Sequence, residues 1–115
     1  MTRIALSAGL VSLAAGLAAA ATLTTPPVIH QTGEVLTCVA VNVGSQDRMM
    51  KADVLEFFNS SPLDSEQDDA APGGAVSASG DGNYCRFTVQ KKNDTRAAAH
   101  VTDGSGNTLA VIPAE

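Results

Sequence analysis

The chain has 115 residues, of which 44% are hydrophobic, 17% are charged and only 3% are aromatic. This length fits one domain, and the hydrophobic fraction is too high for a disordered chain. The formal net charge of −5 argues against a nucleic-acid-binding protein and against electrostatic docking on anionic lipid, because both need a basic face to meet phosphate groups.

The first 21 residues have the pattern of an export signal. Arg3 supplies a positive start, an uncharged apolar run begins at Ile4, and the run ends in the small residues Ala18 to Ala21, which are typical of a signal-peptidase site. A membrane anchor is the alternative, because a run of about 18 residues can span a bilayer. The run is rich in Ala and Gly, however, and no basic cluster follows it.

We therefore predict a signal peptide at 1–21 and a single domain at 22–115, with a periplasmic or secreted location. We expect no stable membrane insertion after the signal is removed. Because Arg3 is the only charged residue in the signal, its removal changes the net charge from −5 to −6.

The chain contains two cysteines, Cys38 and Cys85, and both lie in the predicted exported part. Paired cysteines in an oxidising compartment usually form a disulfide. The alternative is a metal site that also uses His30 and His100, but the close ligand spacing of such sites is absent. We therefore predict a disulfide between the two cysteines. A loop of this length closed by a disulfide stabilises a domain by about 4 kcal/mol in the chain-entropy model.

Residues 34–43 are the clearest predicted strand. One face carries Leu36, Cys38 and Ala40, and the other carries a row of mostly β-branched residues: Val35, Thr37, Val39, Val41 and Val43. Because both faces are largely apolar, the pattern predicts a central strand that is covered on both sides.

Residues 48–58 fit either a strand or a helix. In a strand, Met50, Ala52 and Val54 share a face, and the alternation breaks at 55–58, where we expect a bulge. In a helix capped by Asp47, the shared face would consist of Met50, Val54, Phe57 and Phe58. We predict the strand because the neighbouring segments are strands joined by short turns. The helix would make the fold α+β instead.

Residues 59–74 have the composition of a loop, with a short edge strand near Leu63 as the alternative. The segment contains Pro62, Pro72 and two glycines, and it collects four acids: Asp64, Glu66, Asp68 and Asp69. Four like charges so close together repel one another. We interpret these four residues as a candidate interaction loop for an unknown protein or a cationic ligand; the alternative is a solvated loop that only adds solubility.

The remaining segments also predict short strands. Residues 75–79 form a weak one, and residues 84–90 alternate well between apolar and polar positions. Residues 103–107 are a turn between the last two strands. If Thr102 faces Thr108, then Val101 faces Leu109, Ala99 faces Val111 and Ala97 faces Pro113, which makes one face fully apolar and puts His100 on the other. We predict an all-β fold, a small antiparallel β-sandwich of about seven strands.

Two segments carry a resemblance to a known class. Leu36-Thr37-Cys38-Val39-Ala40-Val41-Asn42-Val43 holds the first cysteine, and Asn83-Tyr84-Cys85-Arg86-Phe87-Thr88-Val89 holds the second. They resemble the immunoglobulin-like or fibronectin-III-like sandwiches, in particular small exported bacterial proteins of unknown function with a cysteine on an early strand and a Tyr-Cys pair on a late one. The resemblance implies the two-sheet architecture and implies no activity.

No residue pattern predicts catalysis or cofactor binding. Serine hydrolysis needs a serine beside a histidine that an acid orients, yet no G-x-S-x-G motif is present, and we interpret His30 and His100 as surface imidazoles. No glycine-rich phosphate-binding loop follows a predicted strand. We therefore predict no catalytic, cofactor-binding or metal-binding residues. The expected function is non-enzymatic, with a binding or structural role; the alternatives are a small secreted hydrolase and an inhibitor of an extracellular enzyme.

Overall fold

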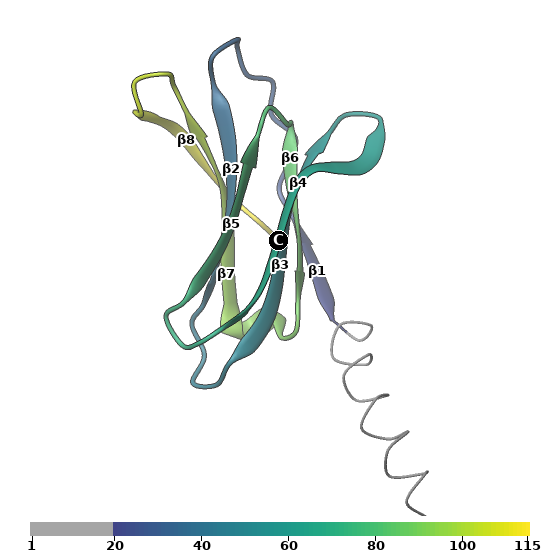
Figure 1. The fold of residues 1–115 in the computed structure, drawn as a ribbon, viewed down its shortest axis with the longest axis vertical. Coiled ribbons are helices and arrows are strands. Elements are labelled where there is room, and N and C mark those ends of the chain that lie inside the picture. The colour runs from purple at the N-terminus through teal and green to yellow at the C-terminus, as the bar shows by residue number, and fades with distance from the viewer. Residues whose placement is uncertain (1–19) are drawn as a thin grey trace, which may run out of the picture.

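A computed structural model describes residues 20–115, which form eight β-strands in two antiparallel sheets (Figure 1). Sheet A has the order β1-β6-β3-β4, formed by Ala21–Thr24 (β1), Tyr84–Val89 (β6), Arg48–Glu56 (β3) and Asn59–Ala70 (β4). Sheet B has the order β5-β2-β7-β8, formed by Ala75–Gly80 (β5), Val35–Asn42 (β2), Thr95–Thr102 (β7) and Thr108–Pro113 (β8).

The predicted all-β sandwich is confirmed, with eight strands rather than about seven. One short 3₁₀ turn, Lys92–Asp94 (η1), precedes β7. The predicted signal peptide at 1–21 lies outside the described residues except for its last two.

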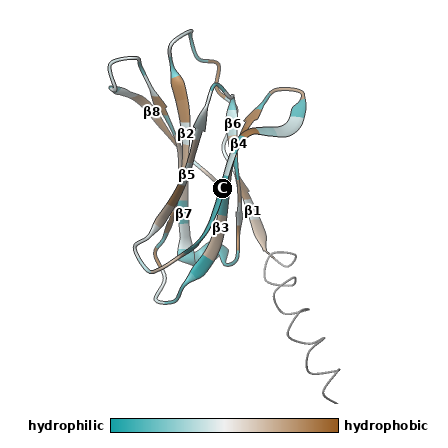
Figure 2. Ribbon diagram, viewed as in Figure 1, coloured by the Kyte–Doolittle hydropathy of each residue, from teal (hydrophilic) through white to brown (hydrophobic). Residues whose placement is uncertain are grey.

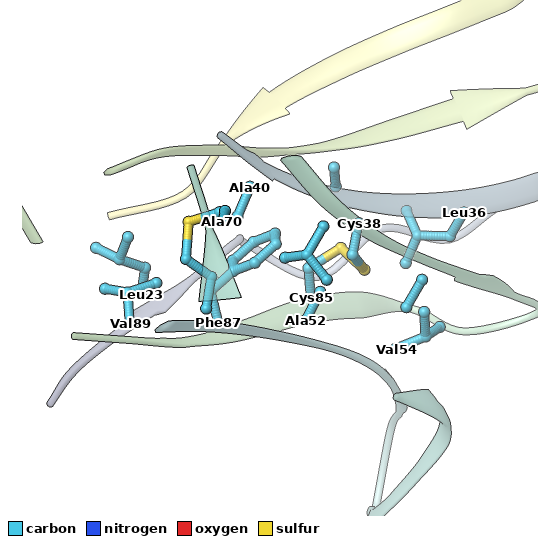
Figure 3. Close-up of a cluster of buried hydrophobic side chains, with 14 of the residues drawn as sticks. Leu23, Leu36, Cys38, Ala40, Ala52, Val54, Ala70, Cys85, Phe87 and Val89 are labelled. Atoms are coloured by element: carbon cyan, nitrogen blue, oxygen red, sulfur yellow. A yellow bond between two sulfur atoms is a disulfide. The ribbon is translucent and has the colours of Figure 1, made fainter. Parts of the chain in front are cut away.

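The core lies between the sheets and is built mainly from alanine, valine and leucine side chains, as the composition predicts (Figure 3). Phe87 is the single aromatic side chain in it. The predicted disulfide is confirmed: Cys38 on β2 and Cys85 on β6 are fully buried and join the two sheets across this core. Because few large side chains are available, this covalent link between the layers replaces packing area that aromatic residues would otherwise supply.

Strand β2 lies in the interior of sheet B, between β5 and β7, but the prediction that both its faces are covered is wrong. Leu36, Cys38 and Ala40 point into the core, whereas Val35 is exposed and the other valines of that row are only half-buried or exposed. A two-layer sandwich covers one face of each sheet. The valines fit the pleated strand through their branched side chains, so their presence does not require a second cover.

Residues 48–56 form a strand, so the strand interpretation is confirmed and the helix alternative is wrong. Met50, Ala52 and Val54 point into the core, and the expected bulge lies between Val54 and Glu56.

The prediction of a loop at 59–74 is wrong, because most of this segment is β4, the longest strand of the fold. It pairs with β3 from Arg48↔Ala70 to Val54↔Asp64 and again at Glu56↔Asn59, and the register shifts between these two stretches. The polar composition of this segment is typical of a loop, but it is also compatible with β4, because β4 is an edge strand. The positions that would face the core of an interior strand carry Asp64, Glu66 and Asp68 here, and these reach solvent at the rim of the sandwich.

The predicted register of the C-terminal hairpin is wrong by one residue beyond its turn. Thr102 faces Thr108 as expected, but a bulge at Leu109 places Val101 opposite Ala110 and Ala99 opposite Ile112. Val111 therefore lies opposite His100 rather than on the core face, and it is more than half exposed. One inserted residue moves every later side chain of the strand to the opposite face, because the side-chain period of a strand is two.

The strands place their connections at two opposite ends of the sandwich. We call one the aromatic end; it consists of the segments 25–34, 57–58, 81–83 and 103–107, and the β3–β4 hairpin projects there at the upper right of Figure 1. The polar end consists of 43–47, 71–74 and 90–94, and hydrophilic residues gather there in the lower part of Figure 2.

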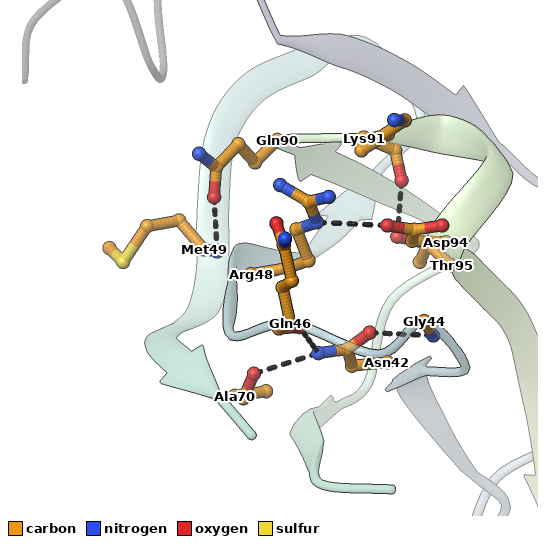
Figure 4. Close-up of polar contacts among 10 residues, drawn as sticks. All are labelled: Asn42, Gly44, Gln46, Arg48, Met49, Ala70, Gln90, Lys91, Asp94 and Thr95. Carbon is orange, nitrogen blue, oxygen red and sulfur yellow. Dashed lines mark hydrogen bonds and ion pairs between the residues drawn. The ribbon is translucent and has the colours of Figure 1, made fainter. Parts of the chain in front are cut away.

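The polar end is closed by hydrogen bonds that join the two sheets (Figure 4). Asn42 at the end of β2 is fully buried, and its amide nitrogen donates to the carbonyl groups of Gln46 at 2.7 Å and Ala70 at 2.9 Å. Its amide oxygen accepts from the Gly44 N–H at 2.9 Å. Close by, Arg48 on β3 donates to Asp94 at 2.9 Å. These contacts explain the polar composition of this end as structural.

Candidate functional site

Three of the four aromatic residues of the chain lie at the aromatic end rather than in the core. Phe57 and Phe58 form the two-residue turn between β3 and β4, and Tyr84 begins β6. The rings of the two phenylalanines have their centroids 6.2 Å apart. In a chain so poor in aromatic side chains, this distribution removes the largest apolar groups from the place where burial would stabilise the fold most.

Phe58 has a backbone conformation that is unusual for its residue type. Its φ is 61°, and it is the only non-glycine residue with a positive φ among residues 20–115. This left-handed region costs a side-chain-bearing residue about 1–2 kcal/mol. The side chain is also fully exposed, so no burial offsets the strain within the domain. Strain of this kind gathers at functional sites.

A cavity of about 260 Å³ lies beside the hairpin and is lined by Thr24, Thr25, Pro27, Phe57 and Tyr84. One wall is the segment after β1, where the Thr25 hydroxyl accepts from the Cys85 N–H at 3.0 Å and the Thr25 N–H donates to the Cys85 carbonyl at 3.1 Å. Pro27 further restricts the backbone of this wall.

Asn83 fixes the other wall of the cavity relative to the first. Its side-chain oxygen accepts from the Phe57 N–H at 3.1 Å, and its side-chain nitrogen donates to the Val28 carbonyl at 3.1 Å. Its backbone N–H donates to Leu55 at 2.7 Å, and its carbonyl accepts from Val28 at 2.7 Å. One residue therefore ties the 25–28 segment to the hairpin, so the cavity is held in shape before any partner arrives.

The neighbouring residues at this end are also held in place. The side chain of His30 is only 7% exposed, and its Nε2–H donates to the Gly82 carbonyl at 2.6 Å, with Asp81 at 3.5 Å. The interpretation of His30 as a surface imidazole is therefore wrong. The packing of the 81–83 segment against β3 needs glycine at position 82, because a Cβ there would overlap the Val54 side chain and lie 2.8 Å from the Leu55 carbonyl oxygen.

Charge at the aromatic end is of one sign. Its segments and the strand end beside them carry Glu34, Glu56, Asp81 and Asp103, and none of the four segments contains Lys or Arg. Asp103 accepts from the N–H groups of Ser105 and Asn107, each at 2.9 Å, and these bonds lower the pKa of its carboxyl group, that to Asn107 most. Four basic residues lie at or next to the polar end: Lys91 and Lys92 in its segments, Arg48 at the start of β3 and Arg96 near the start of β7.

The predicted site residues lie on β4, away from the hairpin turn. Asp64 accepts from the Ser79 N–H of β5 at 3.1 Å, so its carboxylate covers an exposed backbone donor at the edge of sheet B. Asp68 accepts only from the adjacent Asp69 N–H, at 2.9 Å. Glu66 and Asp68 are exposed. The alternation of the strand places Asp69 on the opposite face from the other three, so the four acids do not form one surface.

A buried ion pair on the outer face of sheet A was not predicted. Asp53 is 1% exposed; it accepts from Ser65 at 2.6 Å and from Arg86 at 3.2 Å. These partners come from β4 and β6, on either side of β3. The arrangement satisfies the buried carboxylate and links three strands, which is a structural role.

A shallow cavity of about 300 Å³, also at the aromatic end, is lined by His30, Glu34 and Asp81 among others and has no aromatic ring of Phe or Tyr in its wall. Two still larger cavities lie at the rim where β1 and β8 end their sheets. One has a volume of about 620 Å³ and includes Leu23, Arg96 and Pro113, and the other has a volume of about 460 Å³ and includes Pro26 and Ile112. Glu115, which lines both cavities, pairs with Thr24 of β1 through two backbone hydrogen bonds of 3.0 Å. Neither cavity contains an aromatic side chain, so their walls offer fewer strong contacts than the cavity beside Phe57.

Within residues 20–115, no three His, Cys, Asp or Glu side chains are grouped so that they could hold a metal ion. The same part of the chain contains no helix with the length and hydrophobicity to cross a membrane. No protein-family model, curated protein or solved structure matches the chain.

Sequence reasoning missed Phe57, Phe58 and Tyr84 as site residues. The signal in the sequence becomes readable only once β4 is known to be a strand: a Phe-Phe pair then stands where a two-residue hairpin turn usually has Gly, Asn or Asp. The walls formed by Thr24, Thr25 and Pro27 had no such signal, because only the tertiary structure brings them to the hairpin.

Proposed function

We propose that the protein is an exported, non-enzymatic binding module that holds its partner at the aromatic end. The observation that carries this proposal is Phe58, which is strained and fully exposed and so contributes nothing evident to the fold. Rigid aromatic side chains are the residues most often found as energetic anchors of protein interfaces. The export signal predicted at 1–21 and the disulfide support a location outside the cytoplasm.

The geometry at this end favours binding over catalysis. His30, the histidine of the aromatic end, donates its Nε2 proton to a backbone carbonyl, so this nitrogen does not serve as a general base. The cavity itself is lined by two threonines, a proline and two aromatic residues, which are groups that make contacts rather than groups that transfer protons.

A peptide-display experiment tests this function. Random peptides are selected on the immobilised protein, and their affinities are then measured for the parent and for the variant Phe57→Ser/Phe58→Gly. We expect the variant to lose affinity about tenfold or more, because a central aromatic anchor contributes about 2 kcal/mol. The control is Val111→Ser, which removes an exposed apolar side chain from the outer face of sheet B. Peptides that bind all three proteins alike, or a selection that enriches none, would contradict the proposal.

An inhibitor of an extracellular enzyme is the second candidate, because the β3–β4 hairpin projects from the sandwich and its turn is closed by the pair Glu56↔Asn59 (Figure 1). A projecting turn with phenylalanine at its tip suits the cleft of a peptidase that prefers aromatic substrates. Such a peptidase should be inhibited by the parent and not by Phe58→Gly, with the inhibited rate measured on a small chromogenic substrate.

A further inference from the structure

We propose that the partner at the aromatic end is a basic peptide segment, and that one of its lysine or arginine side chains enters the cavity between Phe57 and Tyr84. This inference rests on the proposed function and specifies the chemistry of the partner. It follows from the charge of the aromatic end, the lining of the cavity and its size.

The charge at this end is complementary to a cationic partner. The acids of the aromatic end are not balanced by any Lys or Arg in its four segments, whereas four of the six basic residues in the described chain lie at or next to the polar end. Asp81 has an 89% exposed side chain, and Glu56 directly precedes Phe57. Opposite charges around an interface speed the encounter of partners and select among them, and salt weakens the effect.

The lining of the cavity suits a cationic side chain with an apolar stem. Phe57 and Tyr84 both line it, and the face of an aromatic ring attracts an ammonium or guanidinium group. The methylene groups of Lys or Arg can pack against Pro27 and the rings. Thr24 lines the same space, and a threonine hydroxyl can accept a hydrogen bond from a charged group.

The size of the cavity favours a side chain over a free small molecule. Its volume of about 260 Å³ lies below the range of roughly 300–1,000 Å³ that is usual for small-molecule pockets. A peptide needs only one anchor side chain here, because Phe58 stands exposed beside the cavity and can contact the neighbouring residues of the same segment.

The chain provides its own probe for the experiment. Tyr84 is the only tyrosine, and there is no tryptophan, so the intrinsic tyrosine emission reports on the wall of the cavity alone. The ligand is a short capped peptide of glycine, leucine and lysine. Two matched peptides carry glutamine or glutamate in place of lysine. All three lack aromatic residues.

Two double variants carry the same change in charge at different places. Glu56→Gln/Asp81→Asn removes two carboxylates at the aromatic end, and Glu66→Gln/Asp68→Asn removes two from the β4 edge. We expect the first to weaken binding of the lysine peptide about three- to tenfold and the second to leave it unchanged. The glutamine peptide should bind at least tenfold more weakly than the lysine peptide at low salt, and the glutamate peptide should not change the Tyr84 emission.

The possible results separate this inference from the function on which it rests. If the glutamine peptide binds the parent as tightly as the lysine peptide, and Phe58→Gly weakens both, the aromatic end binds peptides but not by their charge, and the inference fails alone. If the two double variants weaken binding equally, net charge or β4 attracts the peptide, and the inference also fails. If no peptide changes the Tyr84 emission, and Phe58→Gly binds each of them as the parent does, both proposals fail. If phosphatidylcholine vesicles sediment the parent but not Phe58→Gly, while no peptide binds, the partner is a lipid surface.

Discussion

Phe58 occupies a backbone position that usually belongs to glycine or asparagine, and its side chain makes no buried contact in return. Selection for stability alone would favour Gly, Asn or Asp at this turn, since these residues adopt a positive φ with little or no strain. The residue is therefore a point where stability and the proposed binding function oppose each other.

We predict that Phe58→Gly makes the protein more stable while it removes the proposed binding. Relief of the left-handed strain, reduced by the greater entropy of unfolded glycine, should raise the free energy of unfolding by about 0.5–1 kcal/mol. For a domain of this size, 1 kcal/mol corresponds to a rise in Tm of about 4–8 °C, which calorimetry measures directly. A fall in Tm would show that Phe58 supports the fold after all.

Asn42 at the polar end is the opposite case to Phe58, because its side chain is buried and has a structural role. We predict that Asn42→Ala lowers the free energy of unfolding by about 2–4 kcal/mol, because it leaves the Ala70 and Gln46 carbonyls and the Gly44 N–H without their partner. Urea denaturation measures the loss. Asn42→Asp keeps the acceptor but has no amide donors, and it should cost at least as much. A loss below about 1 kcal/mol in either variant would mean that water replaces these bonds.

At the scale of elements, the edge strands show why β4 collects acids. Sheets end at β1, β4, β5 and β8, and an open edge can pair with another molecule. Each edge has its own protection. β1 pairs with Glu115, β5 is capped at Ser79 by Asp64, and β8 has the bulge at Leu109 and Pro113. β4, the longest edge, carries acids at positions that face inward. Folding thus gives a reason to place them there, which the composition alone did not suggest.

Neutralising the acids of β4 should cause association without unfolding. We predict that Asp64→Asn/Glu66→Gln/Asp68→Asn/Asp69→Asn leaves Tm nearly unchanged, since exposed charges contribute little to stability. The uncharged edge should then pair between molecules, and sedimentation velocity should show larger species as the concentration rises. Glu56→Gln/Asp81→Asn is the control for reduced net charge. A quadruple variant that stays monomeric at every concentration would show that the acids do not protect this edge.

At the scale of the whole molecule, one disulfide joins two sheets whose core contains a single aromatic side chain. A domain of this length has a total stability of only about 5–15 kcal/mol, so a contribution of about 4 kcal/mol from the bridge is a large share of it. The fold therefore depends on an oxidising environment, which agrees with the proposed export.

We predict that Cys38→Ala/Cys85→Ala lowers the free energy of unfolding by about 4 kcal/mol, mainly by freeing the unfolded chain. Reduction of the parent with dithiothreitol should lower its urea midpoint to about that of the variant. The reductant should not change the midpoint of the variant. A double variant within about 1 kcal/mol of the parent would show that packing between the sheets is sufficient without the bridge.

The sequence by itself determined the fold class, most strands and the disulfide. Alternation at 35–42 and 84–89 is a local pattern that needs no knowledge of neighbours, and two cysteines in a chain with a predicted export signal leave one pairing. The tertiary structure decided the rest. Backbone bonds to β3, not composition, make β4 a strand. A single inserted residue at Leu109 moved Val111 from the core face to the surface. The cavity exists because Asn83 ties the segment after β1 to the β3–β4 hairpin, and such long-range contacts have no periodicity in the sequence.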